Sequence, residues 1–187
     1  CRNLGIRVYA NYITGMPYEN KEEILETLNF STEVKADWNT YSILVPYPGT
    51  EIFDDCHQAG YLDKNKLSLE TFSSRKVTIE TEKWDKHWVA DQTYDANIRT
   101  NFLQNHNILH PDGDLDWVAR EIEHIISFHP RHAIGTICLA YIYSKQGYFK
   151  KASNMLKRSE QLLTHKDVQE PYGKYLEWQE DIIFFYK

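Results

Sequence analysis

Residues 4–14, LGIRVYANYIT, and residues 41–45, YSILV, enclose a predicted helix, and together these three segments decide the fold of the first part of the chain. β-Branched and aromatic residues are frequent in the first segment, which is typical of a strand. The residues expected to share its buried face are Ile6, Val8, Ala10 and Tyr12. The second segment is a short continuous apolar run, as expected of a strand buried on both faces.

Asn20 is suited to begin the helix between these strands, because its side chain can accept hydrogen bonds from free backbone N–H groups. Glu23 stands three residues later, at the position that completes a capping box. An apolar stripe then continues until about Lys35. A strand, a helix and a strand in this order predict a βαβ unit with parallel strands and a right-handed crossover.

After the second strand, the sequence changes from strand signals to helical ones. Thr50 is placed to cap a short helix, and Gly60 to end it in a left-handed conformation. From Trp84 onward, apolar residues recur at helical spacing. We therefore expect an α/β unit joined to an all-α unit. Their expected ranges are 1–62 for the α/β unit, 63–83 for a linker and 84–187 for the helical unit.

Within the helical unit, residues 131–164 resemble one tetratricopeptide repeat. The residues that carry this resemblance are Leu139, Ala140, Tyr143, Gly147, Tyr148 and Ala152. An ordinary αα-hairpin with a glycine turn produces the same pattern. Both interpretations of this helix pair stay open from the sequence.

The charge balance and the cysteine content limit the partners and the compartment. The chain has 187 residues and a formal net charge of -6, which argues against a nucleic-acid partner held by phosphate contacts. No apolar stretch approaches the ~20 residues of a spanning helix, so we expect no membrane span. Three cysteines at wide spacing, Cys1, Cys56 and Cys138, do not form a disulfide framework and favour a reducing, cytoplasmic location.

Two blocks in the α/β part, residues 13–19 (ITGMPYE) and 46–50 (PYPGT), stand at the ends of the two predicted strands. In this order they resemble the C-terminal part of the radical S-adenosylmethionine (SAM) barrel, in particular its cobalamin-binding subgroup. The resemblance implies a partial (βα) barrel segment, with SAM and a 4Fe–4S cluster as cofactors and cobalamin as a further possible one. The residues that it places at the SAM site are Ile13, Gly15, Glu19, Pro46 and Tyr47. Each of them also has a purely structural interpretation, as a residue that serves its turn.

The resemblance also implies what this chain lacks. The family holds its cluster with three thiolates in a Cys-x-x-x-Cys-x-x-Cys loop, and no cysteines here have that spacing. We therefore expect a fragment whose first partner is the missing N-terminal part of its own chain, with no catalytic or metal-ligating residue of its own. The substrate, a small or lipid-like molecule, is not specified. The alternative is a tetratricopeptide-like interaction module without catalytic activity.

Three further patterns have structural explanations that we prefer. Acidic residues from Asp112 to Asp116 have the spacing of a calcium loop, but Trp117 stands where glycine is required, which favours an acidic helix start. Two histidine pairs, His106 with His110 and His129 with His132, are expected to be surface residues. A run of aromatic residues is expected in the core rather than in a substrate pocket. The run consists of Trp84, Trp88, Tyr94 and Phe102.

Overall fold

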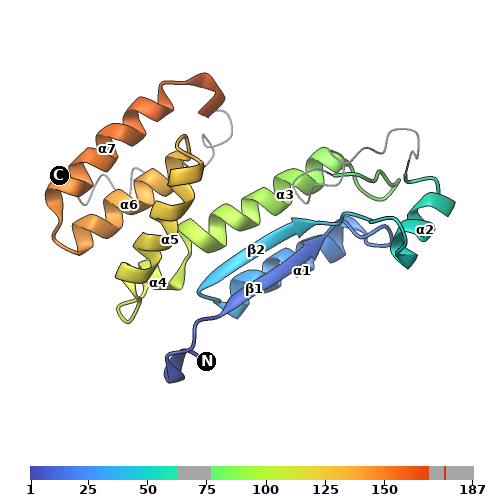
Figure 1. Cartoon of the computed structure of the whole chain (residues 1–187), viewed down its shortest axis with the longest axis horizontal. Coiled ribbons are helices and arrows are strands. Elements are labelled where there is room, and N and C mark those ends of the chain that lie inside the picture. The colour runs from blue at the N-terminus through green and yellow to red at the C-terminus, as the bar shows by residue number, and fades with distance from the viewer. Residues whose placement is uncertain (63–76, 169–174, 176–187) are drawn as a thin grey trace. The chain divides into compact units, whose positions relative to one another are not determined.

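The structure is a computed structural model that describes residues 1–62, 77–168 and 175 (Figure 1). It contains two compact units, Cys1–Asn101 and Phe102–Lys187. The elements of the first unit are a 3-10 helix Arg2–Leu4, β1 Tyr9–Thr14, α1 Lys21–Val34, β2 Trp38–Ile43, α2 Glu51–Gln58 and α3 Lys86–Ile98. A π-helix follows over Arg99–Leu103, and the elements of the second unit are α4 His106–Leu109, α5 Leu115–Phe128, α6 Ala133–Lys145 and α7 Phe149–Leu163.

The expected parallel pairing is confirmed, because β1 and β2 run side by side in the same direction with Tyr9 opposite Trp38 and Thr14 opposite Ile43 (Figure 1). The strand limits differ from the expectation. Gly5 takes a left-handed conformation with φ of 69° and ends the 3-10 helix, so β1 begins only at Tyr9.

The second strand also differs from its predicted limits, since β2 begins at Trp38 rather than Tyr41 and ends at Ile43. Within the predicted segment, Ile43 and Leu44 are buried and the other residues are half-buried, whereas Thr40, which precedes the segment, is exposed. Residues 38–40 contain neither an apolar run nor a strict apolar–polar alternation, so their pattern did not predict a strand.

The helix between the strands forms as expected. The Glu23 backbone N–H donates to Asn20 Oδ1 at 3.0 Å, and the Asn20 backbone N–H donates to Glu23 Oε2 at 2.8 Å. This reciprocal pair is the predicted capping box, and it satisfies donors that the first helical turn leaves free. At the other end of α1, Lys35 takes a left-handed conformation with φ of 50°.

Two helices cover one face of the sheet. Thr14 Oγ1 in β1 lies 2.9 Å from Thr93 Oγ1 in α3. Tyr41 Oη in β2 lies 2.6 Å from Ser31 Oγ in α1 and 2.9 Å from Thr100 Oγ1 in the π-helix. Side chains alternate along a strand, and Tyr41 and Thr14 belong to the same alternating set, so both helices pack on the same side.

This packing corrects the expected domain limits. We placed the start of the all-α unit at residue 84, whereas the first compact unit continues to Asn101. The reason is that α3 covers the sheet through Thr93 instead of joining the later helices. Residues 63–76 of the expected linker lie outside the described residues, and residues 77–83 form no helix or strand.

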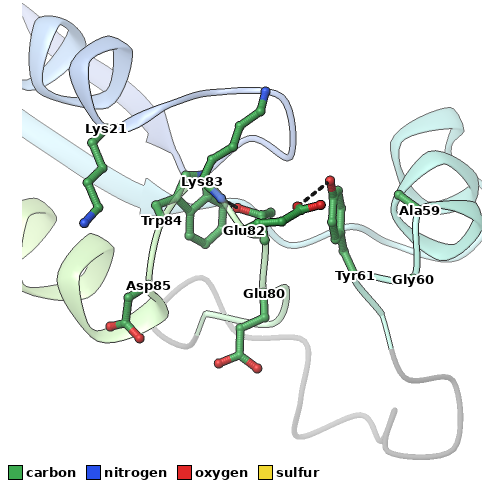
Figure 2. Close-up of a pocket in the computed structure, with 10 residues that line it drawn as sticks. Lys21, Ala59, Gly60, Tyr61, Glu80, Glu82, Lys83, Trp84 and Asp85 are labelled. Carbon is green, nitrogen blue, oxygen red and sulfur yellow. Dashed lines mark hydrogen bonds between the residues drawn. The ribbon is translucent and has the colours of Figure 1, made fainter.

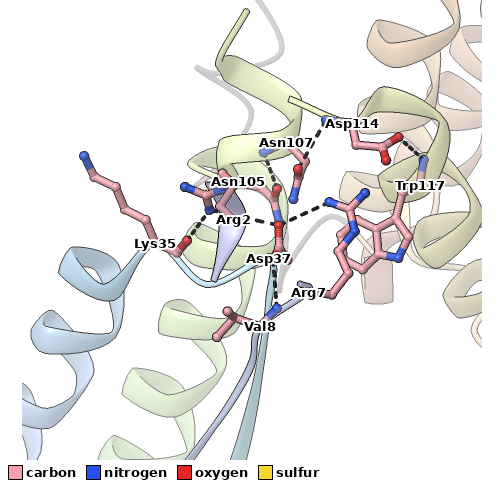
Figure 3. A network of polar contacts seen from close by, with 9 residues as sticks. All are labelled: Arg2, Arg7, Val8, Lys35, Asp37, Asn105, Asn107, Asp114 and Trp117. Carbon is pink, nitrogen blue, oxygen red and sulfur yellow. Dashed lines mark hydrogen bonds and ion pairs between the residues drawn. The ribbon is translucent and has the colours of Figure 1, made fainter. Parts of the chain in front are cut away.

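At the amino-terminal end of the strands, the Asp37 carboxylate is buried and fixes the start of the pair (Figure 3). It accepts the Val8 backbone N–H at 2.8 Å and lies 3.4 Å from Arg7 Nη1. Arg2 donates to the Lys35 carbonyl at 2.6 Å at the same end. In βα architectures this end of the strands serves stability rather than chemistry.

The second unit is a set of helices with α6 at its centre. α6 is buried along nearly its whole length, from Ala133 to Tyr143. It forms the expected hairpin with α7, and Gly147 makes the turn with φ of 79°. The Tyr143 hydroxyl donates to the Glu123 carboxylate of α5, which joins α5 to α6.

The start of α5 confirms the preferred explanation of the acidic pattern. The Trp117 backbone N–H donates to Asp114 Oδ1 at 2.9 Å, so Asp114 is a helix cap (Figure 3). The Asp114 backbone N–H in turn donates to Asn107 Oδ1 at 3.2 Å. Among the described residues, no group of three His, Cys, Asp or Glu side chains is arranged to hold a metal ion.

One histidine differs from the expectation. His132 is not a surface residue, because it lies half-buried at the start of α6 with its ring tilted by 31° against that of Phe102, at 4.7 Å between ring centroids. The Gly135 backbone N–H donates to His132 Nδ1 at 2.9 Å, so the imidazole caps the helix. His106 and His110 stack on each other at 4.4 Å.

Candidate functional site

The two sequence blocks both lie at the carboxyl end of their strands, and the parallel pairing brings these two ends together. The Leu44 backbone N–H donates to the Thr14 carbonyl at 2.9 Å, immediately before the first block turns away at Gly15. The chain after Leu44 therefore starts its own turn beside Gly15. In parallel βα folds, ligands bind outside this carboxyl edge, where the loops converge.

Ile13 is a predicted site residue whose side chain is available to a ligand. Its side chain is 51% exposed, on the sheet face opposite the helices. The Val8 and Thr14 carbonyls accept the backbone N–H groups of Trp38 and Leu44. The even-numbered residues of β1 therefore direct their backbone N–H and C=O groups toward β2. The N–H and C=O of Ile13 consequently point toward the other edge of β1, where no further strand lies among the described residues.

Gly15 has an internal reason to be glycine. Its φ is 78°, a left-handed conformation that residues with a Cβ rarely adopt. A Cβ at this position would lie 3.4 Å from Val89 Cγ1 of α3 and 3.5 Å from Ile43 Cγ2 of β2. The side of Gly15 on which a Cβ would stand therefore contacts the protein core.

Glu19 holds the turn between β1 and α1. Its carboxylate accepts the Met16 backbone N–H at 2.8 Å, and its own backbone N–H donates to the Met16 carbonyl at 3.2 Å. Burial raises the pKa of the Glu19 carboxyl, and the N–H groups of Met16 and Gly15 oppose that shift. These contacts are those of a positioning residue for the turn, which was the structural alternative for Glu19.

Pro46 and Tyr47 follow β2 at the same edge but differ in exposure. Pro46 is buried, whereas the Tyr47 side chain is exposed. The Thr50 hydroxyl donates to the Tyr47 carbonyl at 2.7 Å and accepts the Phe53 backbone N–H at 3.3 Å. Thr50 therefore closes the turn and caps α2 as predicted, and Tyr47 is the exposed ring of this block.

Residues 80–85, which were not predicted to belong to the site, lie beside it. The Lys83 ammonium donates to the Tyr18 carbonyl at 2.6 Å, which fixes residues 80–85 against the turn after β1. An open pocket of about 690 Å³ lies beside this contact, and Tyr61 donates to the Glu82 carboxylate at 3.2 Å along its wall (Figure 2). Its floor contains the buried Trp84 ring. No pattern in the sequence signals this contact, because it joins residues 65 positions apart.

Most of the aromatic run is core, as expected. Trp84 and Phe102 are buried, and Trp88 is packed against the core of the first unit. Lys21 Nζ lies 5.1 Å from the centre of the Trp88 ring. Tyr94 differs, because its side chain is exposed.

The three thiols of the chain do not fit an iron–sulfur cluster. Cys56 and Cys138 are buried, and only Cys1 is exposed. Burial raises the pKa of both buried thiols, which opposes the thiolate form that a cluster requires. No step of a reaction can be assigned to a cluster on these residues.

Comparison with known proteins gives one match over part of the chain. Over 91 residues, which are 49% of this chain, it is 28% identical to a protein of Pyrococcus horikoshii described as an uncharacterized methyltransferase. The matched segment covers 18% of the length of that protein. No family model matches the chain, and no solved structure does. Within the described residues, no helix combines the length and apolar character needed to cross a membrane.

Proposed function

We propose that this chain is the C-terminal part of a radical SAM enzyme related to methyl transfer, and that β1 and β2 form part of the wall of its barrel. The observation that carries the proposal is the common edge at which both sequence blocks end, next to an uncovered sheet face. The similarity to a described methyltransferase supports the reaction class. The activity belongs to the whole protein, of which this chain supplies one portion.

The uncovered sheet face fits the inner wall of a barrel. A parallel sheet in a complete domain is covered on both faces. Here α1 and α3 cover one face, while Asn11, Ile13 and Thr40 are exposed on the other. In a βα barrel the helices lie outside and the opposite face points to the interior. The small polar side chains on that face suit a ligand-lined interior.

The residues at the carboxyl edge fit the adenosyl part of SAM. SAM supplies either a methyl group or, after reductive cleavage, a 5′-deoxyadenosyl radical. The exposed side chain of Ile13 can contact the adenine ring. Glu19 holds the neighbouring turn, and the exposed Tyr47 borders the same edge. Because the thiols do not fit a cluster, cobalamin and cluster binding are assigned to the rest of the parent.

The parent protein provides the test. After anaerobic reconstitution with iron and sulfide, it is expected to cleave SAM. Ile13→Asn is expected to raise the KM for SAM about tenfold, since the ring contact is lost. Tyr9→Asn is the matched control, because Tyr9 is also 51% exposed in β1 but lies at its other end. A parent that lacks a three-cysteine loop, or that leaves SAM intact, contradicts the proposal.

A second function rests on the α6–α7 hairpin. α6 and α7 form a helix pair joined by a turn at Gly147, which is the unit that a tetratricopeptide array repeats, and Tyr148 and Phe149 are exposed at that turn. In that case the α/β part is structural, and further repeats follow Lys187 in the parent. A parent sequence with repeats after this chain and no cluster loop before it selects the second function.

A further inference from the structure

The turn between β1 and α1, residues 15–19, is held at one end by a lysine that lies 65 positions later in the sequence. The Lys83 ammonium donates to the Tyr18 carbonyl at 2.6 Å, and its side chain extends toward the loop after β1 (Figure 2). A hydrogen bond from a charged donor is stronger than one between neutral groups. Lys83 therefore restrains the backbone of the turn at Tyr18.

The other end of the turn contacts the residue next to Lys83. Trp84 is 2% exposed, and its Cη2 atom lies 3.8 Å from the position that a Cβ on Gly15 would take. Val89 Cγ1 of α3 lies 3.4 Å from the same position. Two consecutive residues thus contact both ends of the turn, Lys83 at Tyr18 and Trp84 at Gly15.

The start of α3 fixes the segment that carries these two residues. Asp85 Oδ1 accepts two backbone N–H groups from the first turn of α3, at 2.8 and 3.0 Å, so Asp85 caps the helix. Thr93 of α3 in turn contacts Thr14 of β1, with 2.9 Å between their hydroxyl oxygens. The segment is therefore anchored through α3 to the strand that leads into the turn.

Lys83 acts on the peptide group that closes the turn. The Tyr18 carbonyl and the Glu19 N–H belong to one trans peptide group and point in opposite directions. The carbonyl accepts from Lys83, while the N–H donates to the Met16 carbonyl at 3.2 Å. The Glu19 carboxylate also accepts the Met16 backbone N–H at 2.8 Å. Restraint of this peptide group therefore restrains Glu19 as well.

We propose that Lys83 is a positioning residue of the SAM site, which holds the Tyr18–Glu19 peptide and thereby the turn that borders the adenosyl part of SAM. Lys83 acts through the turn and not by contact with SAM. The role in SAM binding rests on the proposed function, whereas the role in the turn rests on the contacts of Lys83 and Trp84. Loss of the Lys83 ammonium weakens binding through the turn, so it raises the KM for SAM more than it lowers kcat.

Amide hydrogen exchange in the chain tests the role of Lys83 in the turn. Lys83→Met keeps an unbranched stem but removes the charged donor, and is expected to make the Glu19 amide exchange about fivefold faster. Lys83→Arg retains a charged donor and is expected to restore the slower exchange. Lys86→Met is the matched control, because Lys86 pairs with Glu80 at 3.1 Å instead of with the turn. An unchanged Glu19 amide in Lys83→Met, or equal acceleration in Lys86→Met, overturns the proposal.

SAM binding by the anaerobically reconstituted parent, measured by calorimetry and by steady-state kinetics, tests the consequence for the site. Lys83→Met is expected to raise the Kd and the KM for SAM about fivefold with a smaller effect on kcat, and Lys83→Arg to restore both constants. Lys86→Met is expected to leave them unchanged. Equal SAM binding by Lys83→Met and the original parent overturns the proposal.

The outcomes separate this inference from the proposed function. A parent that cleaves SAM equally well with Lys83→Met supports the function and overturns the inference. A parent that neither binds nor cleaves SAM contradicts the function and the role of Lys83 in SAM binding, while faster Glu19 exchange in the Lys83→Met chain supports its role in the turn.

Discussion

At the scale of single residues, Gly15 shows that backbone conformation and packing can require a glycine in a turn, whether or not a ligand binds there. Its left-handed backbone disfavours any residue with a Cβ, and a Cβ there would already contact Val89 and Ile43, so a longer side chain would collide with the core. A sequence pattern that marks a ligand-binding glycine therefore marks a packing position here. Ile13 gives the opposite result, because its exposed side chain and outward peptide groups have no structural use within the described unit.

Gly15→Leu is expected to destabilise the first unit by about 3 kcal/mol, from the left-handed conformation and from overpacking against Val89 and Ile43, which a Cβ alone would already contact. Gly5→Leu is the control, since Gly5 has φ of 69° but nothing within 4 Å of its Cβ position. Its expected cost is about 1 kcal/mol, from the backbone alone. Urea unfolding of both variants measures the difference, and equal costs would show that Val89 moves away without loss.

His132 gives the chain a pH-dependent stability. Burial lowers the pKa of His132 to about 4 from its usual 6.5, because the half-buried imidazole caps α6 in its neutral form. Between these values the unfolded state binds more protons, so stability rises with pH and is lost as pH falls from 6.5 toward 4. The expected loss is about 3 kcal/mol.

The matched variants for this effect are His132→Asn and His124→Asn. Asparagine caps a helix without titrating, so His132→Asn is expected to flatten the dependence of unfolding free energy between pH 4 and 6.5. His124 is exposed, and its replacement is expected to leave the dependence unchanged. An unchanged slope in His132→Asn would contradict the assignment.

The sequence predicted where the site residues lie in the fold, but it did not predict which hydrogen bonds they make. Parallel pairing placed Gly15 and Pro46 at one edge, as expected from a βαβ pattern. The sequence did not predict that Glu19 would bind the Met16 N–H or that Lys83 would reach Tyr18, because these contacts depend on tertiary approach. Local spacing contains no such information.

At the scale of elements, α1 was predicted well because its signals are local. Asn20 and Glu23 lie within one turn, and their reciprocal bonds need no other element. The limits of β2 were predicted poorly because Asn39 depends on Asn101, which is 62 residues away. A polar residue in a buried strand cannot be recognised from the sequence alone, because its burial depends on a distant hydrogen-bond partner.

Asn101→Leu is expected to destabilise the first unit by about 3 kcal/mol, because the buried N–H and C=O of Asn39 lose both partners. Asn11→Leu is the control on the exposed side of the sheet and is expected to change stability by less than about 0.5 kcal/mol. Denaturant unfolding of the two variants tests the role of the amide. Equal stability of the Asn101 variant and the original would show that the edge closes in another way.

At the scale of the whole molecule, the two units differ in how completely they enclose their cores. Among the described residues, the first unit has no strand beside the outer edge of β1 and leaves one sheet face exposed, whereas α6 of the second unit is buried along nearly its whole length. Local opening requires less free energy where fewer buried contacts must break. The division after Asn101 was not predicted, because the amphipathic pattern of α3 does not indicate which unit it covers.

Backbone amides of β1 are therefore expected to exchange faster than those of α6 in the chain by at least tenfold. Mass-spectrometric hydrogen exchange measures both regions in one experiment. Equal protection of β1 and α6 would indicate that the first unit is complete by itself.

The hydroxyl contacts of Tyr41 also constrain how this protein can change in evolution. One phenol meets Ser31 Oγ of α1 and Thr100 Oγ1 near α3, in a layer where water has little access. The Ser31 and Thr100 hydroxyls also donate to the Leu28 and Ala96 carbonyls of their own helices, whereas the phenol has its hydrogen-bond partners, among the described residues, only in these two hydroxyls. Loss of both would leave the phenol unsatisfied. In related sequences, the absence of hydroxyl groups at both 31 and 100 should consequently accompany a phenylalanine at 41.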